Sequence, residues 1–201
     1  MTGATVSLAI VVGFLAAATV ARIRFRGRAG FLLLVAIAQM APFEALLIPF
    51  YLVVRDIGLY NKLPALVLIY FIFTLPFTIW SLRGFVAGIP VDLEEAAMVD
   101  GATRFGAFLR VTLPLLAPGL VATSIFCFIT AWNEYFYAFV FMTDAQNYTL
   151  PVWLGSFRTN FGTDWGATMA ASTLFTLPVL IFFLLVQKRM VGGLTAGAVK
   201  G

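Results

Sequence analysis

The feature that most constrains this chain is a series of long apolar runs that contain almost no charged residues. Each run is close to the ~20 residues that an α-helix needs to cross a bilayer. The runs cover residues 1–21, 29–54, 63–82, 120–142 and 167–187. Of the 201 residues, 62% are hydrophobic and only 11% are charged, too few to cover the surface of a water-soluble globule. The sequence therefore predicts an all-α polytopic membrane protein with about five transmembrane helices, forming a single domain over residues 1–201.

Lysine and arginine are distributed unevenly among the segments that connect these runs. Ten of the 13 lie in the alternate segments 22–28, 83–118 and 188–201. Positively charged loops tend to stay in the cytoplasm, so these segments are expected inside, together with the C-terminal tail 188–201. Met1 is then outside, and a first helix that starts outside after almost no residues suggests a preceding helix that starts inside.

Several classes of chemistry are excluded by residues that the chain lacks. It has no histidine, which removes Ser-His-Asp and Cys-His nucleophile pairs and histidine metal sites. Its single cysteine, Cys127, cannot form an internal disulfide or a thiolate cluster. No stretch matches the phosphate-binding pattern G-x-x-x-x-G-K-[ST]. We expect no catalytic residue, metal or cofactor on this chain, and we attribute its net charge of +4 to topology rather than to nucleic-acid binding.

A few polar residues fall inside the apolar runs, where ionisable groups are costly and often functional. The second run contains Glu44 between two prolines, so its helix must break or kink. The fourth contains Glu134 among amide and aromatic neighbours, a combination that suits polyhydroxyl ligands. The alternative is that these groups tie helices together or belong to an interfacial aromatic belt. The candidate substrate-path residues are Gln39, Glu44, Trp132, Asn133, Glu134 and Tyr135.

The long connection 83–118 is predicted to hold two short helices. A capping box formed by Asp92 and Glu95 starts the first helix, which ends where Gly101 can adopt a left-handed conformation. Thr103 caps the second helix, and Leu113-Pro114 stops it.

Helices this short are marginal in water, so the pair must pack on another surface. Leu93, Ala96, Ala97 and Met98 supply the small or flexible apolar residues that fit a groove on a partner protein. A connection that lies against lipid headgroups is the alternative.

One spacing in this connection resembles a known family. Glu95-Ala96-Ala97, three residues, Gly101, nine residues, Val111, one residue and Leu113-Pro114 is similar to the EAA loop of binding-protein-dependent ABC importer permeases, with valine in place of the usual isoleucine. The resemblance covers nearly the whole chain and is closest to carbohydrate-type permeases, such as those for maltose, trehalose and glycerol 3-phosphate. It is supported by the stretches Arg24–Gly27, Ala131–Tyr135, Asp164–Gly166 and Gly193–Gly201. Members of this family usually have six spans and a longer N-terminal part.

The resemblance implies a prokaryotic inner-membrane subunit that moves a sugar or polyol inward by alternating access. Its implied partners are a second permease subunit, an ATPase dimer that uses ATP and Mg²⁺, an external solute-binding protein and the lipid bilayer. The connection would be a coupling helix seated on the ATPase, so Gly101→Pro or Ala97→Trp should uncouple transport. The implied coupling residues are Leu93, Glu94, Glu95, Ala96, Ala97, Met98, Asp100, Gly101, Leu113 and Pro114.

Three other functions remain as alternatives. An ABC permease for another solute would share the EAA loop. An ion-coupled secondary transporter or channel is suggested by Glu44 in the broken second run. An intramembrane enzyme is disfavoured by the absence of histidine and of paired intramembrane aspartates.

Overall fold

A computed structural model describes residues 1–159 and 162–198, with side chains as far as Gln187. Nearly all of this part of the chain is helical. The long helices are α1 (Thr2–Arg22), α2 (Arg28–Met40), α4 (Leu63–Gly88), α8 (Ala117–Asn133) and α11 (Trp165–Ala198). The shorter helices are η1 (Glu44–Leu46), α3 (Leu47–Asp56), α5 (Asp92–Val99), α6 (Arg104–Ala107), η2 (Phe108–Thr112), α7 (Leu113–Leu115), α9 (Phe136–Phe141), η3 (Ala145–Asn147) and α10 (Leu150–Gly155). Strands β1 (Arg158–Thr159) and β2 (Gly162–Thr163) pair in antiparallel fashion.

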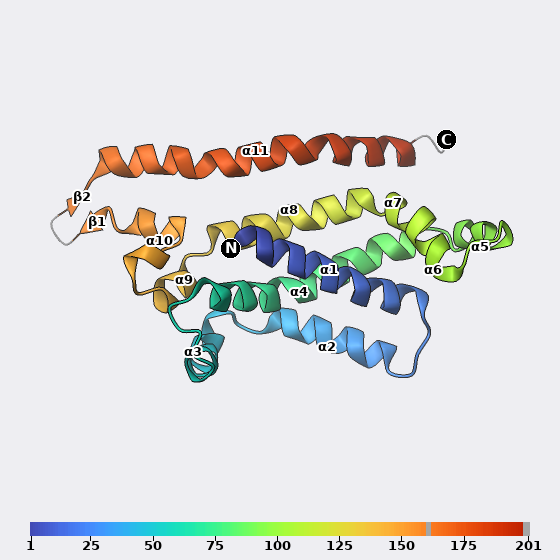
Figure 1. The fold of residues 1–201 in the computed structure, drawn as a ribbon, viewed down its shortest axis with the longest axis horizontal. Helices are drawn as coiled ribbons and strands as arrows, with labels where there is room; N and C mark the ends of the chain where they lie inside the picture. The colour runs from blue at the N-terminus through green and yellow to red at the C-terminus, as the bar shows by residue number, and fades with distance from the viewer. Residues whose placement is uncertain (160–161, 199–201) are drawn as a thin grey trace.

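The long helices lie roughly along one axis, and the short elements gather at the two ends (Figure 1). One end carries the α1–α2 connection, α5, α6 and the end of α11. The other end carries α3, α9, α10, β1 and β2. The described parts of the three segments rich in lysine and arginine therefore share one end of the molecule, as their alternation in the sequence requires.

Three helices, α1, α4 and residues 165–187 of α11, are long and apolar enough to cross a membrane by themselves. Two further candidates are bent pairs, and counting each as one span gives up to five. The first bent pair confirms the expected break in the second run: α2 and the η1–α3 segment meet at 91°. In the second pair, residues 104–115 and α8 meet at 65°.

Some boundaries differ from those expected from the sequence. α4 continues to Gly88, beyond the expected end at Leu82, because arginine favours a helix, the single Gly84 does not end it, and the next proline is Pro90. The fourth run divides: α8 ends at Asn133, and a separate helix, α9, begins at Phe136. α11 continues to Ala198 through most of the segment expected as a tail, and residues 199–201 lie outside the described residues.

The core is formed where α1, α4 and α8 pack together. Two polar side-chain contacts link α4 to α8: Thr78 Oγ1 lies 3.2 Å from Cys127 Sγ, and Ser81 Oγ lies 3.1 Å from Thr123 Oγ1. At the α3–α9 end, buried Tyr137 and its neighbours form an aromatic cluster. Its rings are those of Phe43, Phe50, Phe73, Phe136, Tyr137 and Phe141.

α11 packs mainly along α8, and only 6% of the apolar stretch within its residues 165–187 is buried. The seam between the two helices is a stack of aromatic rings. Phe128 of α8 stacks on Phe182 at 4.3 Å between centroids, and Trp132 of α8 stacks on Phe175 at 5.5 Å.

Candidate functional site

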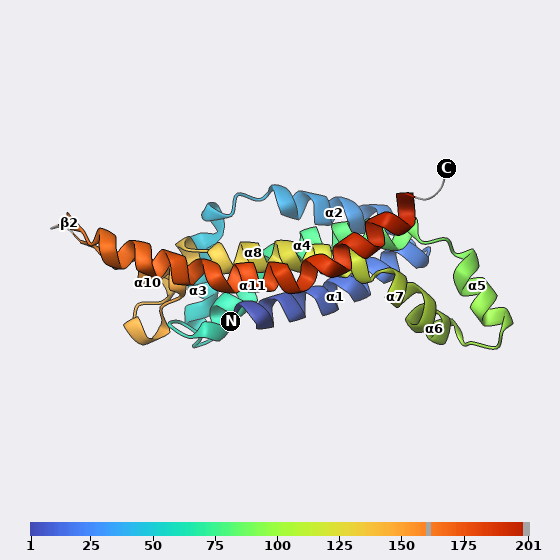
Figure 2. The ribbon, with the colours of Figure 1, turned by 90° about the horizontal axis from the view of Figure 1, so that it is seen from above.

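α5 and α6 extend beyond the ends of α1, α4 and α8, at the end that carries the basic connections (Figure 2). α5 begins at Asp92, as the sequence predicts, but the predicted capping box is wrong. Val91 is the N-cap residue, and its carbonyl accepts from the N–H groups of Glu94 at 2.9 Å and Glu95 at 3.1 Å. Val91 already has a helical conformation after Pro90, so Asp92 becomes the first helical residue rather than the cap.

The end of α5 follows the prediction. Gly101 has a φ of +90°, in the left-handed region that favours glycine. Its N–H donates to the carbonyl of Met98 at 3.0 Å, and the N–H of Ala102 donates to the carbonyl of Ala97 at 3.0 Å. These two bonds are those of a Schellman motif, which fixes the direction in which the chain leaves α5. Thr103 caps α6 as predicted, because its hydroxyl accepts from the N–H of Gly106 at 3.1 Å.

Leu113-Pro114 does not stop the second helix, contrary to the prediction. η2 is a π-helical turn, and the chain continues through α7 before it bends into α8. Pro114 lacks an N–H, so the carbonyl of Arg110 loses its α-helical donor, and the wider turn accommodates this loss. Leu113 is half-buried and Pro114 is exposed.

One face of α5 packs against α6 and η2. Glu94, Ala97 and Met98 occupy the i, i+3 and i+4 positions of this face, and all three are buried or half-buried. Glu94, Ala97 and Met98 thus pack against the chain's own elements, and their coupling to an ATPase stays a prediction.

The opposite face of α5 is open. Leu93, Glu95 and Ala96 are exposed on it, and Asp100 and Gly101 are exposed at its end. The Glu95 side chain makes no hydrogen bond or ion pair with any residue that the structure describes. Large apolar side chains are also exposed on α5 and on the segments next to it in the chain: Val91, Leu93, Val99, Phe105 and Leu109. Val99 is 88% exposed and Phe105 71% exposed, so this end of the molecule presents an apolar surface. We call it the α5–α6 surface.

Glu94 is held from two sides within the chain. Its Oε1 accepts from Arg22 Nε at 2.8 Å and from the hydroxyl of Thr112. Arg22 Nη2 also donates to the carbonyl of Ile89 at 3.0 Å. This cluster joins the end of α1, the segment after α4, α5 and η2.

Glu134 lies at the break between α8 and α9, and both of its carboxylate oxygens are occupied. Oε1 accepts from the N–H of Tyr137 at 2.8 Å, and Oε2 accepts from the N–H of Ala138 at 3.1 Å. The hydroxyl of Tyr70 on α4 also donates to Oε2. Glu134 therefore stabilises the start of α9 and ties it to α4, as in the helix-linking alternative raised by the sequence. A substrate contact by Glu134 stays a prediction.

The other substrate-path candidates are dispersed. Exposed Asn133 donates to the carbonyl of Ile129 in its own helix at 3.0 Å, and Tyr135 stacks on Phe139. Gln39 and Glu44 are exposed on either side of the α2–η1 break. Of the six candidates, only Trp132 lines the pocket described next.

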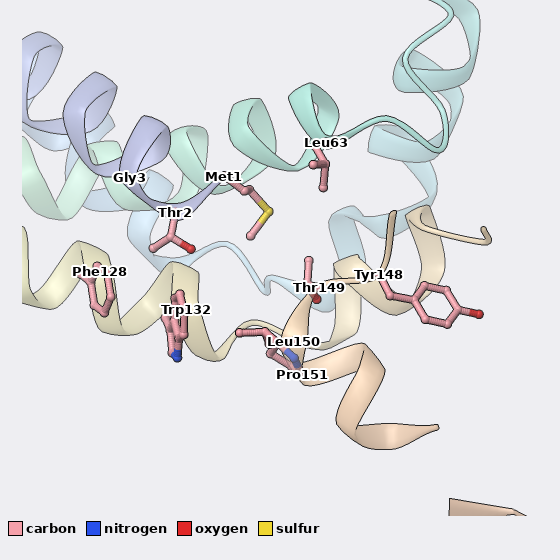
Figure 3. Close-up of a pocket in the computed structure, with 10 residues that line it drawn as sticks. All are labelled: Met1, Thr2, Gly3, Leu63, Phe128, Trp132, Tyr148, Thr149, Leu150 and Pro151. Carbon is pink, nitrogen blue, oxygen red and sulfur yellow. The ribbon is translucent and has the colours of Figure 1, made fainter. Parts of the chain in front are cut away.

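A pocket of about 360 Å³ lies where the start of α1 meets α8 and α10 (Figure 3). Its lining residues are Met1, Thr2, Gly3, Leu63, Phe128, Trp132, Tyr148, Thr149, Leu150 and Pro151. Two polar atoms of this lining, Trp132 Nε1 and Thr149 Oγ1, are buried without a hydrogen-bond partner among the described residues. The ring of Trp132 also stacks on Phe128 and Phe175, so it belongs both to the pocket lining and to the α8–α11 seam. An aromatic ring beside unpaired polar atoms is a combination that suits a sugar.

Sequence reasoning did not find the Arg22–Glu94 pair or the pocket. The position of Glu94 on the same helical face as Ala97 and Met98 was the available signal that Glu94 points inward. No local pattern links Arg22 to a residue 72 positions away.

Comparisons with known proteins agree with this geometry. Residues 9–195 match the family described as binding-protein-dependent transport system inner membrane component. The chain is 54% identical over its full length to the diacetylchitobiose uptake system permease protein DasC of Streptomyces coelicolor, covering 73% of that protein. It is 40% identical over 98% of its length to the trehalose transport system permease protein SugB of Mycobacterium tuberculosis, covering 73% of that protein.

A solved structure also matches. The structure belongs to a bacterial ABC transporter involved in the import of the acidic polysaccharide alginate. The TM-score is 0.74 with 27% identity, over 93% of this chain and 70% of the other. The chain therefore belongs to the family of inner membrane permease components of binding-protein-dependent transport systems.

Proposed function

We propose that the chain is a permease subunit of an ATP-driven importer that carries a sugar, with a disaccharide-sized solute as the first choice. The observation that carries the proposal is the α5–α6 surface on a member of this family. The importer would also contain a second permease subunit, an ATPase dimer that uses ATP and Mg²⁺, and an external solute-binding protein.

The α5–α6 surface would be the seat of the ATPase. It projects from the bundle, it is apolar, and it carries unpaired Glu95 as a partner for a basic side chain. Closure of the ATPase dimer around nucleotide would then move α5 as a rigid body and change which end of the pathway is open. This end of the molecule also carries the basic connections and the end of α11, and it would be cytoplasmic.

The choice of a sugar rests on the relatives and on the pocket. The relatives named above transport diacetylchitobiose and trehalose, by their names. The pocket lining combines the Trp132 ring with two polar atoms that have no hydrogen-bond partner among the described residues, a combination that suits a ring with several hydroxyl groups. We propose that the sugar passes this pocket, so that Trp132→Ala raises the half-saturating sugar concentration while Trp132→Phe has a smaller effect.

The decisive experiment reconstitutes the chain with its ATPase, second permease and solute-binding protein in vesicles, and measures uptake of labelled diacetylchitobiose and trehalose. Uptake should require ATP and the binding protein. Uptake driven by an ion gradient without ATP would favour a secondary transporter and overturn the proposal.

Docking is tested separately by substitution on the open face of α5. The exposed side chain of Ala96 makes Ala96→Trp the appropriate variant, because half-buried Ala97 would disturb internal packing instead. Ala96→Trp should lower the amount of ATPase that co-purifies by about tenfold, since a large ring cannot enter a close-packed interface. Ala87→Trp, at an exposed position of α4, is the matched control and should retain the ATPase.

A further inference from the structure

Arg22, Glu94 and Thr112 form a cluster that no part of the proposed docking surface uses. The side chains of Arg22 and Glu94 are only 15% and 10% exposed, and they meet at 2.8 Å. Arg24 and Arg26, in the α1–α2 connection, are exposed and make no ion pair with any described residue. Arg22 is therefore distinguished from its neighbours by its burial and its partner.

The cluster joins segments that the chain itself leaves unconnected. α5 follows α4 after a short link, and η2 continues through α7 into α8, so chain connectivity already ties α5 and η2 to these two helices. α1 has no such connection to α5. Arg22 supplies it through Glu94, and Phe14 of α1 adds a ring contact to Phe108 of η2 at 5.5 Å between centroids.

Burial determines how firmly this connection holds. Exposed ion pairs contribute little and are screened by salt, whereas removal of one partner from a buried pair leaves an uncompensated charge. The hydroxyl of Thr112 and the carbonyl of Ile89 complete the hydrogen bonding on the two sides of the pair. α1 and α5 are thus expected to move together rather than to slide past each other.

We propose that Arg22, Glu94 and Thr112 are positioning residues that make α1 follow the movement of α5 during the transport cycle. Glu94 thereby acts inside the permease, whereas the adjacent Glu95 faces the ATPase. This inference rests on the proposed function, because it assigns the internal step that would follow ATPase docking.

The test compares two adjacent glutamates in the assembled transporter. Glu94→Gln keeps the shape of the side chain and removes its charge, and Thr112→Val removes one hydroxyl at nearly constant volume. Glu95→Gln, with the same chemical change at an exposed position, is the matched control. ATPase co-purification, sugar uptake and ATP hydrolysis are measured for each variant.

Glu94→Gln should keep its ATPase yet transport at least about tenfold less sugar per ATP hydrolysed. Thr112→Val should transport about threefold less sugar per ATP hydrolysed, as expected for the loss of one hydrogen bond. Glu95→Gln should lose ATPase and uptake together, with sugar carried per ATP unchanged. The double variant Arg22→Gln with Glu94→Gln should lower sugar transport per ATP no further than the more damaging single variant does, because the two residues act through each other.

Two results would overturn the inference. One is normal sugar transport per ATP by Glu94→Gln, and the other is loss of ATPase and uptake in proportion, as expected for Glu95→Gln. Failure of the parent chain to retain any ATPase would instead contradict the proposed function, so the two failures are distinguishable.

Discussion

Gly13 shows how a single residue sets the distance between two helices. A Cβ atom added there would lie 2.4 Å from Thr78 Cγ2 and 3.0 Å from Thr78 Cβ. Small residues at helix interfaces allow this kind of close backbone approach in membrane proteins. The α1–α4 contact therefore depends on the absence of a side chain at Gly13.

Gly13→Ala is expected to destabilise the protein by about 1–3 kcal/mol, because a packed interface must open to accept the methyl group. Thermal unfolding in detergent measures the effect. Gly84→Ala is the control, since a Cβ at that position of α4 would meet nothing within 4 Å. Equal stability of the two variants would show that α1 and α4 separate easily.

Glu134 illustrates a residue whose type suggested one role and whose contacts indicate another. Glu134→Gln replaces a carboxylate that accepts three hydrogen bonds with an amide that can accept at only one end. We expect a loss of about 1–3 kcal/mol in stability and an unchanged half-saturating sugar concentration. Thermal unfolding and uptake kinetics check the two parts. Unchanged stability with a raised half-saturating concentration would instead assign Glu134 to the substrate path.

At the scale of the element, the turn after α5 determines the geometry of the α5–α6 surface. In Gly101→Ala, the positive φ should strain the alanine backbone by about 1–2 kcal/mol, and ATP-driven uptake should fall partially. Gly101→Pro should abolish uptake, because proline cannot adopt this φ and removes the N–H that donates to Met98.

Uptake is compared with the amount of protein in the membrane, which both Gly101 variants should leave unchanged. Gly88→Ala at the end of α4 is the control, because a Cβ there meets nothing within 4 Å and its φ is ordinary. Normal uptake by Gly101→Pro would show that the turn does not transmit movement.

The elements differ in how well local sequence predicted them. The C-terminal end of α5 and the cap of α6 were predictable, because Gly101 and Thr103 act on backbone groups a few residues away. The role of Glu94 was not, since it depends on Arg22, which is distant in sequence. The interruption at Glu134 was also missed, because the run from Leu120 to Met142 is apolar on both sides of it.

At the scale of the whole molecule, the arrangement of the two ends predicts the orientation in the membrane. A cysteine in place of exposed Arg26 should react with a membrane-impermeant maleimide only when the cytoplasmic side is accessible. A cysteine in place of exposed Asp56, at the opposite end, should react in intact cells. The parent chain gives the background signal, because its single cysteine, Cys127, is 0% exposed and should not react. The reverse labelling pattern would invert the proposed topology.

The ring stack between α8 and α11 has a consequence for biogenesis. α11 is synthesised after α1, α4 and α8, and the part of it that the structure describes with side chains makes ring contacts to α8 through Phe175 and Phe182. α1, α4 and α8 can therefore associate before α11 leaves the translocon, and α11 can pack onto them afterwards as a separate cooperative unit. Maturation of the subunit should accordingly proceed in two steps, with the second governed by aromatic contacts rather than by the polar ties of the core.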